Sequence, residues 1–292
     1  MIGIKKWDAF SIFNYVFLSL FCMLAVYPMI YVLAGSLNDG NDYMRGGVYF
    51  FPRQFSLASY KIVFEDERLY TGFMITTLRT VIGTVASVLF TAMVAYAMSR
   101  KKLVGRSVYS WIFLFTMFFG GGLIPYFLVL KFLHLLNTFW VFVIPTMFSV
   151  FNMIIMQSFF RELPEEMLES ASLDGAGDFG MFAKLALPLS MPVLATVAMW
   201  NGVWHWNEFY DAMLFTNNEK LMTLQLYLMK LIKESDMISA NSQFIPPQAR
   251  RAFSVTTVRM AAIIISTIPI LFVYPFMQRY FVTGIMVGSL KG

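Results

Sequence analysis

The sequence predicts an all-α polytopic membrane protein, and three observations lead to this fold class. Of the 292 residues, 58% are hydrophobic and only 13% are charged, whereas soluble domains carry roughly 25% charged residues. Apolar runs close to the roughly twenty residues of one membrane-spanning helix recur along the chain. No linker, repeat or low-complexity tract separates these runs. We therefore expect residues 1–292 to form a single transmembrane domain.

Six of the apolar runs are predicted to cross the lipid bilayer as helices. They cover about residues 12–35, 74–99, 108–131, 138–160, 189–214 and 258–282. The second run contains Arg79 among three threonines, so its outer end is expected to lie at the membrane interface or to face protein. The third run contains the glycines 120–122 followed by Pro125. A broken helix is expected there, because freed backbone groups are tolerated where protein or water satisfies them.

The orientation of the helices follows from Lys and Arg in the short loops. The loop between the second and third runs contains four basic residues and no acid, namely Arg100, Lys101, Lys102 and Arg106. This loop is expected to be cytoplasmic. Alternation then places both termini, with Lys5, Lys6 and Lys291, in the cytoplasm. No basic run is long enough to bind nucleic acid.

Two segments outside the membrane are long enough to contact another protein. The segment 36–73 contains the turn-forming sequence N-D-G-N-D at residues 38–42. The segment 217–251 contains L-Q-L-Y-L-M-K-L-I-K, which predicts a surface helix, followed by the helix breakers Pro246 and Pro247.

The most acidic stretch of the chain is residues 161–192, between two apolar runs. Pro164 is suited to the first position of a helix, and Glu165 and Glu166 follow where the helix dipole favours negative charge. Gly175 can adopt the left-handed conformation that ends a helix. A second short helix is expected over about residues 179–187, before Pro188. The stretch therefore predicts a helix, a glycine turn and a second helix at a membrane surface.

The sequence E-S-A-S-L-D-G-A-G-D-F-G-M-F-A-K-L-A-L-P-L-S-M-P resembles the EAA loop of ABC importer permeases. The matching positions are Glu169, Ala171, Asp174, Gly175, Ala176, Pro188 and Pro192. Ser170 stands where the family often has Ala. The C-terminal residues Gln278, Arg279, Gly284, Gly288, Lys291 and Gly292 resemble the carbohydrate branch of this family, of the maltose-type second-permease kind.

The resemblance implies a type I ABC importer permease fold in which residues 161–192 dock on a cytoplasmic ATPase through a coupling helix. The ATPase-coupling residues would be Glu165, Glu166, Glu169, Ala171, Asp174, Gly175 and Ala176. It also implies a heterotetramer with a second permease and two ATPase copies, an extracytoplasmic solute-binding protein, and location in the bacterial cytoplasmic (inner) membrane. ATP and Mg²⁺ would bind the ATPase, since this chain has no G-x-x-x-x-G-K-[ST] motif. No catalytic or metal site is expected on this chain.

A substrate path is suggested by polar and aromatic residues in the apolar runs. Along residues 200–211, Trp200, Trp204, Asn207 and Asp211 are spaced to share one helical face, and Asn201, His205 and Glu208 the neighbouring one. Aromatic rings beside amides suit sugars, while an aromatic belt with interhelical hydrogen bonds is an equally physical alternative. The candidate path residues are Gly121, Asn152, Asn201, Trp204, Asn207 and Glu208.

The resemblance extends to the subgroup that imports complex, often acidic oligosaccharides such as alginate. Five arginines could attract such a sugar or could be rim charges, namely Arg45, Arg53, Arg79, Arg250 and Arg251. Two other functions stay open from the residues. One is a secondary transporter with Glu208 or Asp211 as a proton site, and the other is a membrane-embedded glycosyl transferase, although no acidic pair for the latter is evident.

Overall fold

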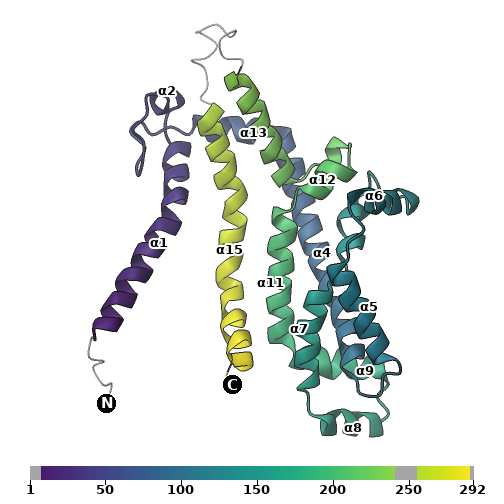
Figure 1. Ribbon diagram of the computed structural model, residues 1–292. Coiled ribbons are helices and arrows are strands. Elements are labelled where there is room, and N and C mark those ends of the chain that lie inside the picture. The colour runs from purple at the N-terminus through teal and green to yellow at the C-terminus, as the bar shows by residue number, and fades with distance from the viewer. Residues whose placement is uncertain (1–7, 241–254, 290–292) are drawn as a thin grey trace. The chain divides into compact units, whose positions relative to one another are not determined.

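A computed structural model describes residues 8–240 and 255–289 of the chain, and the helices of this part are shown in Figure 1. Among these residues the structure is helical, and the one extended pairing is an isolated bridge between Asn38 and Phe55. The chain divides into two compact units. Unit 1 comprises Met1–Glu67 and Leu228–Ile268, and unit 2 comprises Arg68–Tyr227 and Pro269–Gly292. The basic residues near both termini, and Pro246, Pro247, Arg250 and Arg251, lie outside the described residues.

Unit 1 contains the first predicted span and the start of the last one. Its helices are α1 (Ala9–Ser36), α2 (Gly40–Tyr43), α3 (Ala58–Glu65) and parts of α13 (Leu224–Ala240) and α15 (Val255–Ser289). The side chain of Asp8 accepts a hydrogen bond from the Ser11 N–H at 3.0 Å, which caps α1. Ser59 Oγ donates to Thr257 Oγ1 at 2.8 Å and joins α3 to α15. Both α1 and α15 are apolar enough to cross a bilayer.

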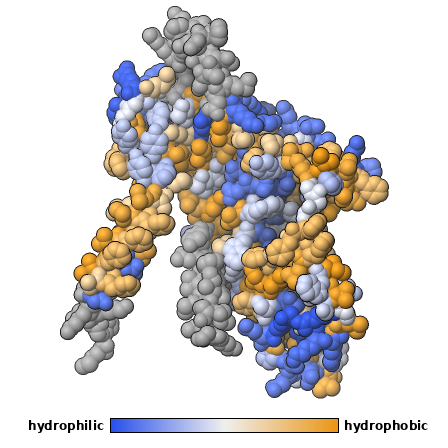
Figure 2. Space-filling model, in the orientation of Figure 1, coloured by the Kyte–Doolittle hydropathy of each residue, from blue (hydrophilic) through white to orange (hydrophobic). Residues whose placement is uncertain are grey.

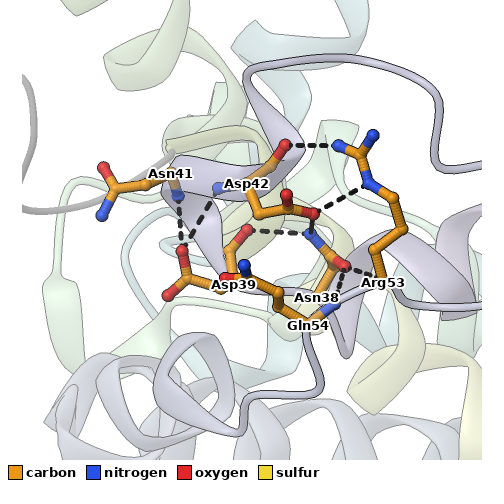
Figure 3. Close-up of polar contacts among 6 residues, drawn as sticks. All are labelled: Asn38, Asp39, Asn41, Asp42, Arg53 and Gln54. Atoms are coloured by element: carbon orange, nitrogen blue, oxygen red, sulfur yellow. Dashed lines mark hydrogen bonds and ion pairs between the residues drawn. The ribbon is translucent and has the colours of Figure 1, made fainter.

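The turn predicted at residues 38–42 is the centre of a side-chain network (Figure 3). Asn38 Oδ1 accepts the backbone N–H groups of Arg53 and Gln54 at 2.7 and 3.0 Å. Its Nδ2 donates to Asp42 Oδ2 at 3.1 Å, and Arg53 Nε donates to the same oxygen at 3.0 Å. The hydrogen bond from Asn38, with the bond and charge of Arg53, lowers the pKa of Asp42. The network joins residues 38–42 to residues 53–54 and so connects the two ends of the loop between α1 and α3.

Unit 2 contains the long helix α4, whose buried residues share one core with residues of α7 and α11 (Figure 1). The elements are α4 (Glu67–Ser99), α5 (Arg106–Phe118), α6 (Leu123–Phe132), the 3₁₀ helices η1 (Phe139–Phe142) and η2 (Ile144–Thr146), α7 (Val150–Arg161), α8 (Glu165–Leu173), α9 (Asp178–Met181), η3 (Phe182–Ala186), α10 (Leu187–Leu189), α11 (Met191–Asn207), α12 (Tyr210–Phe215) and η4 (Glu219–Leu221). Helix α7 packs against both α5 and α11. Their core contains Ala92, Tyr96, Met156, Phe160, Phe182 and Val197.

Helix α4 begins at Glu67, earlier than the predicted boundary near residue 74. Its outer end faces protein, because Thr76 and Arg79 are fully buried. Thr76 Oγ1 accepts the N–H of Leu224 at 2.8 Å. The predicted surface helix is the start of α13, where Leu224 and Tyr227 are buried and Lys230 and Lys233 are exposed.

The third predicted span is broken at its glycines, as expected. Helices α5 and α6 meet at an angle of 115°, and Gly122 between them has φ +83°, a conformation that glycine adopts at no steric cost. Two further pairs are bent, by 49° between residues 139–146 and 150–161 and by 81° between 178–189 and 191–207. The described residues thus hold three long candidate spans, or up to six if each bent pair is one span.

The crossing of α4 and α11 depends on Gly83. A Cβ atom at Gly83 would lie 2.6 Å from Cε1 and Nε2 of His205, so the imidazole occupies the space of a side chain. We expect Gly83→Ala to destabilise the folded protein by about 1–3 kcal/mol, as overpacked cores do, which a thermal unfolding assay in detergent would measure. Gly202→Ala is the control, because its Cβ would meet nothing closer than Thr84 Oγ1 at 3.7 Å. Equal melting temperatures for the two variants would contradict the expectation.

Candidate functional site

The acidic stretch 161–192 has the predicted helix, turn and helix, at one end of unit 2 (Figure 1). Helix α8 runs over Glu165–Leu173 and follows Pro164, which is the residue before the helix and not its first residue. Glu165 and Glu166 occupy the first turn, where the exposed N–H groups and the helix dipole favour carboxylates. The local sequence therefore explains where the helix begins.

Gly175 ends α8 in a left-handed conformation with φ +83°. The N–H of Gly175 donates to the carbonyl of Ser172 at 3.1 Å, and the N–H of Ala176 donates to the carbonyl of Ala171 at 2.9 Å. These two bonds form a Schellman motif, which satisfies the last carbonyls of a helix and needs positive φ at the residue after the cap. The predicted left-handed conformation of Gly175 is confirmed.

The second helical part extends from α9 through η3 and α10 to Leu189. The segment η3, Phe182–Ala186, is a π-helix, with one more residue in its hydrogen-bonded ring than an α-helix has. Phe182 and Ala186 are buried in the core of unit 2. The loop thus returns to the membrane-spanning part through a packed, hydrogen-bonded helix.

Aromatic side chains join α4 to the residue before the acidic stretch and to its second helical part. The ring of Tyr96 lies between those of Phe160 and Phe182, with centroids 5.7 and 5.3 Å away. The guanidinium carbon of Arg100 lies 4.6 Å from the centroid of the Tyr96 ring. Edge-to-face and cation–π contacts of this kind each stabilise packing by roughly 0.5–1.5 kcal/mol. These contacts join α4, α7 and η3.

One ion pair joins the first turn of α8 to the basic loop after α4. Lys101 Nζ lies 2.7 Å from Glu165 Oε1. The hydrogen bond and charge of Lys101 lower the pKa of Glu165. Because the folded-state pKa is lowered, the stabilisation is present above the unfolded-state pKa and is lost as the pH falls through the folded-state value. Both side chains are largely exposed, so the pair fixes the loop locally and adds little to global stability.

Removal of the Lys101 charge is expected to raise the pH at which Glu165 titrates. We expect Lys101→Met to shift the titration of the Glu165 carboxyl upward, measured by carbon-13 NMR of labelled glutamate in detergent micelles. Lys102→Met should shift it less, because Lys102 acts on Glu165 through charge alone and more weakly. Equal shifts in the two variants would show that the hydrogen bond from Lys101 does not lower the pKa of Glu165 beyond the effect of a nearby positive charge.

The outward face of the acidic stretch combines carboxylates with two prominent apolar side chains. Glu166, Glu169 and Asp174 are exposed, and Leu173 and Phe179 are 88% and 70% exposed. Hydrophilic surface gathers over this end of unit 2 in Figure 2. Apolar side chains within a polar rim are typical of a surface that another protein covers.

Small side chains keep the turn of the acidic stretch open. Ala171 and Ala176 are half-buried, and a Cβ on Gly175 would have no atom within 4 Å among the described residues. The turn can therefore be approached closely from outside.

The candidate substrate-path residues fall into separate places. Asn152 on α7 and Asn201 on α11 face each other, with Asn152 Nδ2 donating to Asn201 Oδ1 at 3.5 Å. Trp204 is partly exposed, and its ring meets His205 edge-on at 4.9 Å. Asn207 Nδ2 donates to the carbonyl of Val203 at 2.8 Å within its own helix. The structure thus brings the two asparagines together and leaves Trp204 and Asn207 at the end of α11.

Gly121 lies apart from that group, in the break between α5 and α6, where it is exposed. The helical face proposed for residues 200–211 is also interrupted. Helix α11 ends at Asn207, with Glu208 as its C-terminal cap and α12 beginning at Tyr210. The interpretation that Asp211 continues the face of Trp204 is therefore wrong, because the helix does not run that far.

Arg79 explains why α11 ends there, and the sequence analysis missed this role. Its guanidinium donates to the carbonyl of Glu208 at 3.0 Å and to Asp211 Oδ2 at 3.3 Å. The side chain is 0% exposed and lies over the ring of Phe142, 4.8 Å from its centroid. Arg79 is therefore not a rim charge. An arginine inside an apolar run is the sequence signal that could have indicated a functional or structural role. The partners of Arg79, Glu208 and Asp211, are 129 and 132 residues away in the chain, and no local sequence pattern identifies them.

Known proteins resemble this chain over nearly its whole length. A permease protein of the polygalacturonan/rhamnogalacturonan transport system of Bacillus subtilis (strain 168), YtcP, is 36% identical over 97% of this chain and 98% of its own length. A chain in the crystal structure of a bacterial ABC transporter involved in the import of the acidic polysaccharide alginate superposes with a TM-score of 0.85 at 32% identity, covering 95% of this chain and 99% of that one.

A second solved structure shares the fold alone. It is a bacterial alginate ABC transporter in complex with an alginate pentasaccharide-bound periplasmic protein, and it superposes with a TM-score of 0.59 at 12% identity over 92% of this chain and 93% of that one. The sequence pattern of the binding-protein-dependent transport system inner membrane components matches residues 83–287. This range begins within α4, contains the acidic stretch, and ends near the end of α15. The chain therefore belongs to the family of binding-protein-dependent transport system inner membrane components.

Proposed function

We propose that this chain is a permease subunit of an ABC importer for oligosaccharides, with acidic oligosaccharides as the main substrate class. The substrate class follows from the relatives, whose names state transport of polygalacturonan or rhamnogalacturonan and import of alginate. The proposed coupling role is carried by one observation, the α8 helix closed by a Schellman turn at Gly175 and presented on an acidic, exposed surface. A proton-coupled carrier and a glycosyl transferase do not fit this family.

In this proposal α8 is the coupling helix, and residues 161–192 transmit the state of a cytoplasmic ATPase to the spans. Glu166, Glu169 and Asp174 are exposed for recognition by the partner. Ala171 and Ala176 are small enough for close approach around Gly175. Only a loop that makes different contacts with the open and closed ATPase can shift the permease between its two states. The packing around Tyr96 supports this role, because it connects α4 to α7 and η3, the segments on either side of α8.

The remaining partners follow from the same proposal. A second permease, an ATPase dimer that binds ATP and Mg²⁺, and an extracytoplasmic solute-binding protein complete the assembly. The chain lies in the bacterial inner membrane as a single domain, with both termini and the acidic stretch in the cytoplasm. The basic loop 100–106 supports this orientation through the positive-inside rule.

Co-purification is the experiment that tests the assignment. The tagged full chain, expressed in its native host, should bring down an ATPase and a second permease. The complex in proteoliposomes should hydrolyse ATP faster with a binding protein and an acidic oligosaccharide than with neutral ones. Stimulation by neutral oligosaccharides alone would overturn the substrate class, and transport by the isolated chain without ATP would overturn the function.

The end of α11 is where we place sugar contact on this subunit. Gly121, Asn152, Asn201 and Glu208 are further positions along the proposed path. We expect Trp204→Ala or Asn207→Ala to raise the oligosaccharide concentration for half-maximal ATPase stimulation by about tenfold, which corresponds to about 1.4 kcal/mol of lost contact. Basal ATPase activity should stay unchanged. If both variants lose thermal stability and keep their substrate response, these residues form an aromatic belt and not a binding site.

A further inference from the structure

The loop that follows α1 runs back along that helix. Three contacts follow one another down α1, joining Ser36 to Tyr60, Tyr31 to Tyr43, and Tyr27 to Phe50. The two hydroxyl pairs are 2.8 and 2.7 Å apart, and the Tyr27 and Phe50 rings are 5.3 Å apart. Tyr27 precedes the end of α1 at Ser36 by nine residues, or about 14 Å at 1.5 Å per residue. The far end of the loop therefore lies well below the end of the helix.

The depth of Tyr27 in the bilayer can be bounded from the length of α1. The helix has 28 residues and is apolar along its length. Crossing the hydrocarbon core takes about twenty residues. A core beginning at Ala9, directly after the charged Asp8, would end near Pro28. Any later start, or any tilt of the helix, moves that end further towards Ser36. Tyr27, and Phe50 against it, therefore lie at or inside the hydrocarbon boundary.

The side chains at this depth suit a lipid environment. Tyr49, Phe50 and Phe51, which we call the aromatic tip, are all more than half exposed, and Phe51 is 82% exposed. Three consecutive rings facing water would be a large apolar patch for a soluble surface. Aromatic rings are instead enriched where headgroups meet acyl chains.

The backbone of the loop holds the aromatic tip in place. Gly46 and Gly47, with φ +74° and +83°, allow the chain to reverse. Arg53 is bound by Asp42, donating from Nε to its carboxylate and from a second guanidinium nitrogen to its carbonyl at 2.8 Å. Asn38 Oδ1 accepts hydrogen bonds from the backbone N–H groups of Arg53 and Gln54, where the chain returns towards the end of α1 (Figure 3). Asp42 and Arg53 are thus paired within the loop, and the rings are presented without much further loss of conformational freedom.

We infer that the aromatic tip is a membrane anchor that inserts into the lipid interface beside α1. The depth of Phe50 favours lipid over a soluble partner protein, because a partner protein docks above the headgroups. The inference needs α1 to cross the bilayer, and it depends neither on the transported sugar nor on which side of the membrane the loop faces.

Site-directed spin labelling measures this directly. The full chain carrying Cys22→Ala would receive a nitroxide at Tyr49→Cys or Phe51→Cys, and at Asn41→Cys in the same loop as a control, since Asn41 is exposed and lies on α2. In nanodiscs of phosphatidylcholine, labels at the tip should collide frequently with dissolved oxygen and rarely with a water-soluble nickel chelate. The label at residue 41 should show the opposite preference.

Two outcomes would overturn the inference. Frequent collision with the nickel chelate at positions 49 and 51 would place the tip in water. Shielding from both reagents at these positions would mean that protein covers the tip. Neither outcome bears on the proposed transport function, which the co-purification experiment tests separately.

Discussion

Gly175→Val is expected to abolish transport while leaving the protein inserted in the membrane. Valine is β-branched and is strongly disfavoured at φ +83°, at a cost of roughly 1–3 kcal/mol. The Schellman bonds from Gly175 and Ala176 would break, and α8 would end in another direction. Because the apolar spans are untouched, the variant should be found in membranes at a normal level. ATPase co-purification and oligosaccharide uptake should fall at least tenfold.

Gly177→Val is the matched control for this experiment. Gly177 lies in the same turn and, like Gly175, would place a Cβ in open space. Its φ of −71° and ψ of 166° suit any residue, so the variant should bind the ATPase and transport. Normal transport by Gly175→Val would show that the turn is not the coupling element. Glu169→Lys should also lower ATPase binding, by reversing an exposed charge.

Arg79→Leu is expected to destabilise the protein by about 3–5 kcal/mol, the range for removal of one partner from a buried ion pair. The change removes the guanidinium that pairs with the Asp211 carboxylate. It also removes the hydrogen bond that Arg79 donates to the Glu208 carbonyl. Thermal unfolding of the purified complex would measure the loss. Arg79→Leu combined with Asp211→Asn should recover part of it, because the unpaired charge is then absent.

Arg53→Leu provides the comparison for Arg79→Leu. It removes an arginine from the same kind of ion pair, but the Arg53 side chain is 44% exposed and that of Arg79 is 0% exposed. Its effect on thermal stability should therefore be smaller. A melting temperature for Arg79→Leu that equals the wild-type value would show that the pair contributes nothing to the fold.

Much of the fold was predictable, because the hydrocarbon core demands long apolar helices. The ends of α1 and the break at the glycines of the third run follow from local sequence. The start of α4 at Glu67 does not, because the polar residues before the apolar run become helical by packing: Gly72 lies against the backbone of Leu224. The end of α11 at Asn207 likewise depends on Arg79. Both boundaries are set by contacts between distant residues.

The candidate coupling site was predictable in shape, since a proline, a first-turn acidic pair and Gly175 each act within a few residues. The pairing of Lys101 with Glu165 was not, because nothing in the two loops shows that they meet. The path residues were predicted as one continuous helical face. The face is broken at Glu208, where the backbone carbonyl bonds to Arg79, so periodicity alone overestimated its length.

The π-helical segment Phe182–Ala186 holds one residue more than a regular α-helical turn would need. A π turn closes its hydrogen bond over five residues and an α turn closes it over four, so one wide turn absorbs the additional residue while the helix on either side keeps nearly the same direction. With one residue fewer there, the bonds could close in the α pattern and the acidic face of α8 would keep its direction relative to α11. Single-residue deletions within Phe182–Ala186 are therefore expected to be tolerated more readily than single-residue deletions in α11, where each lost residue rotates the following side chains by about 100°.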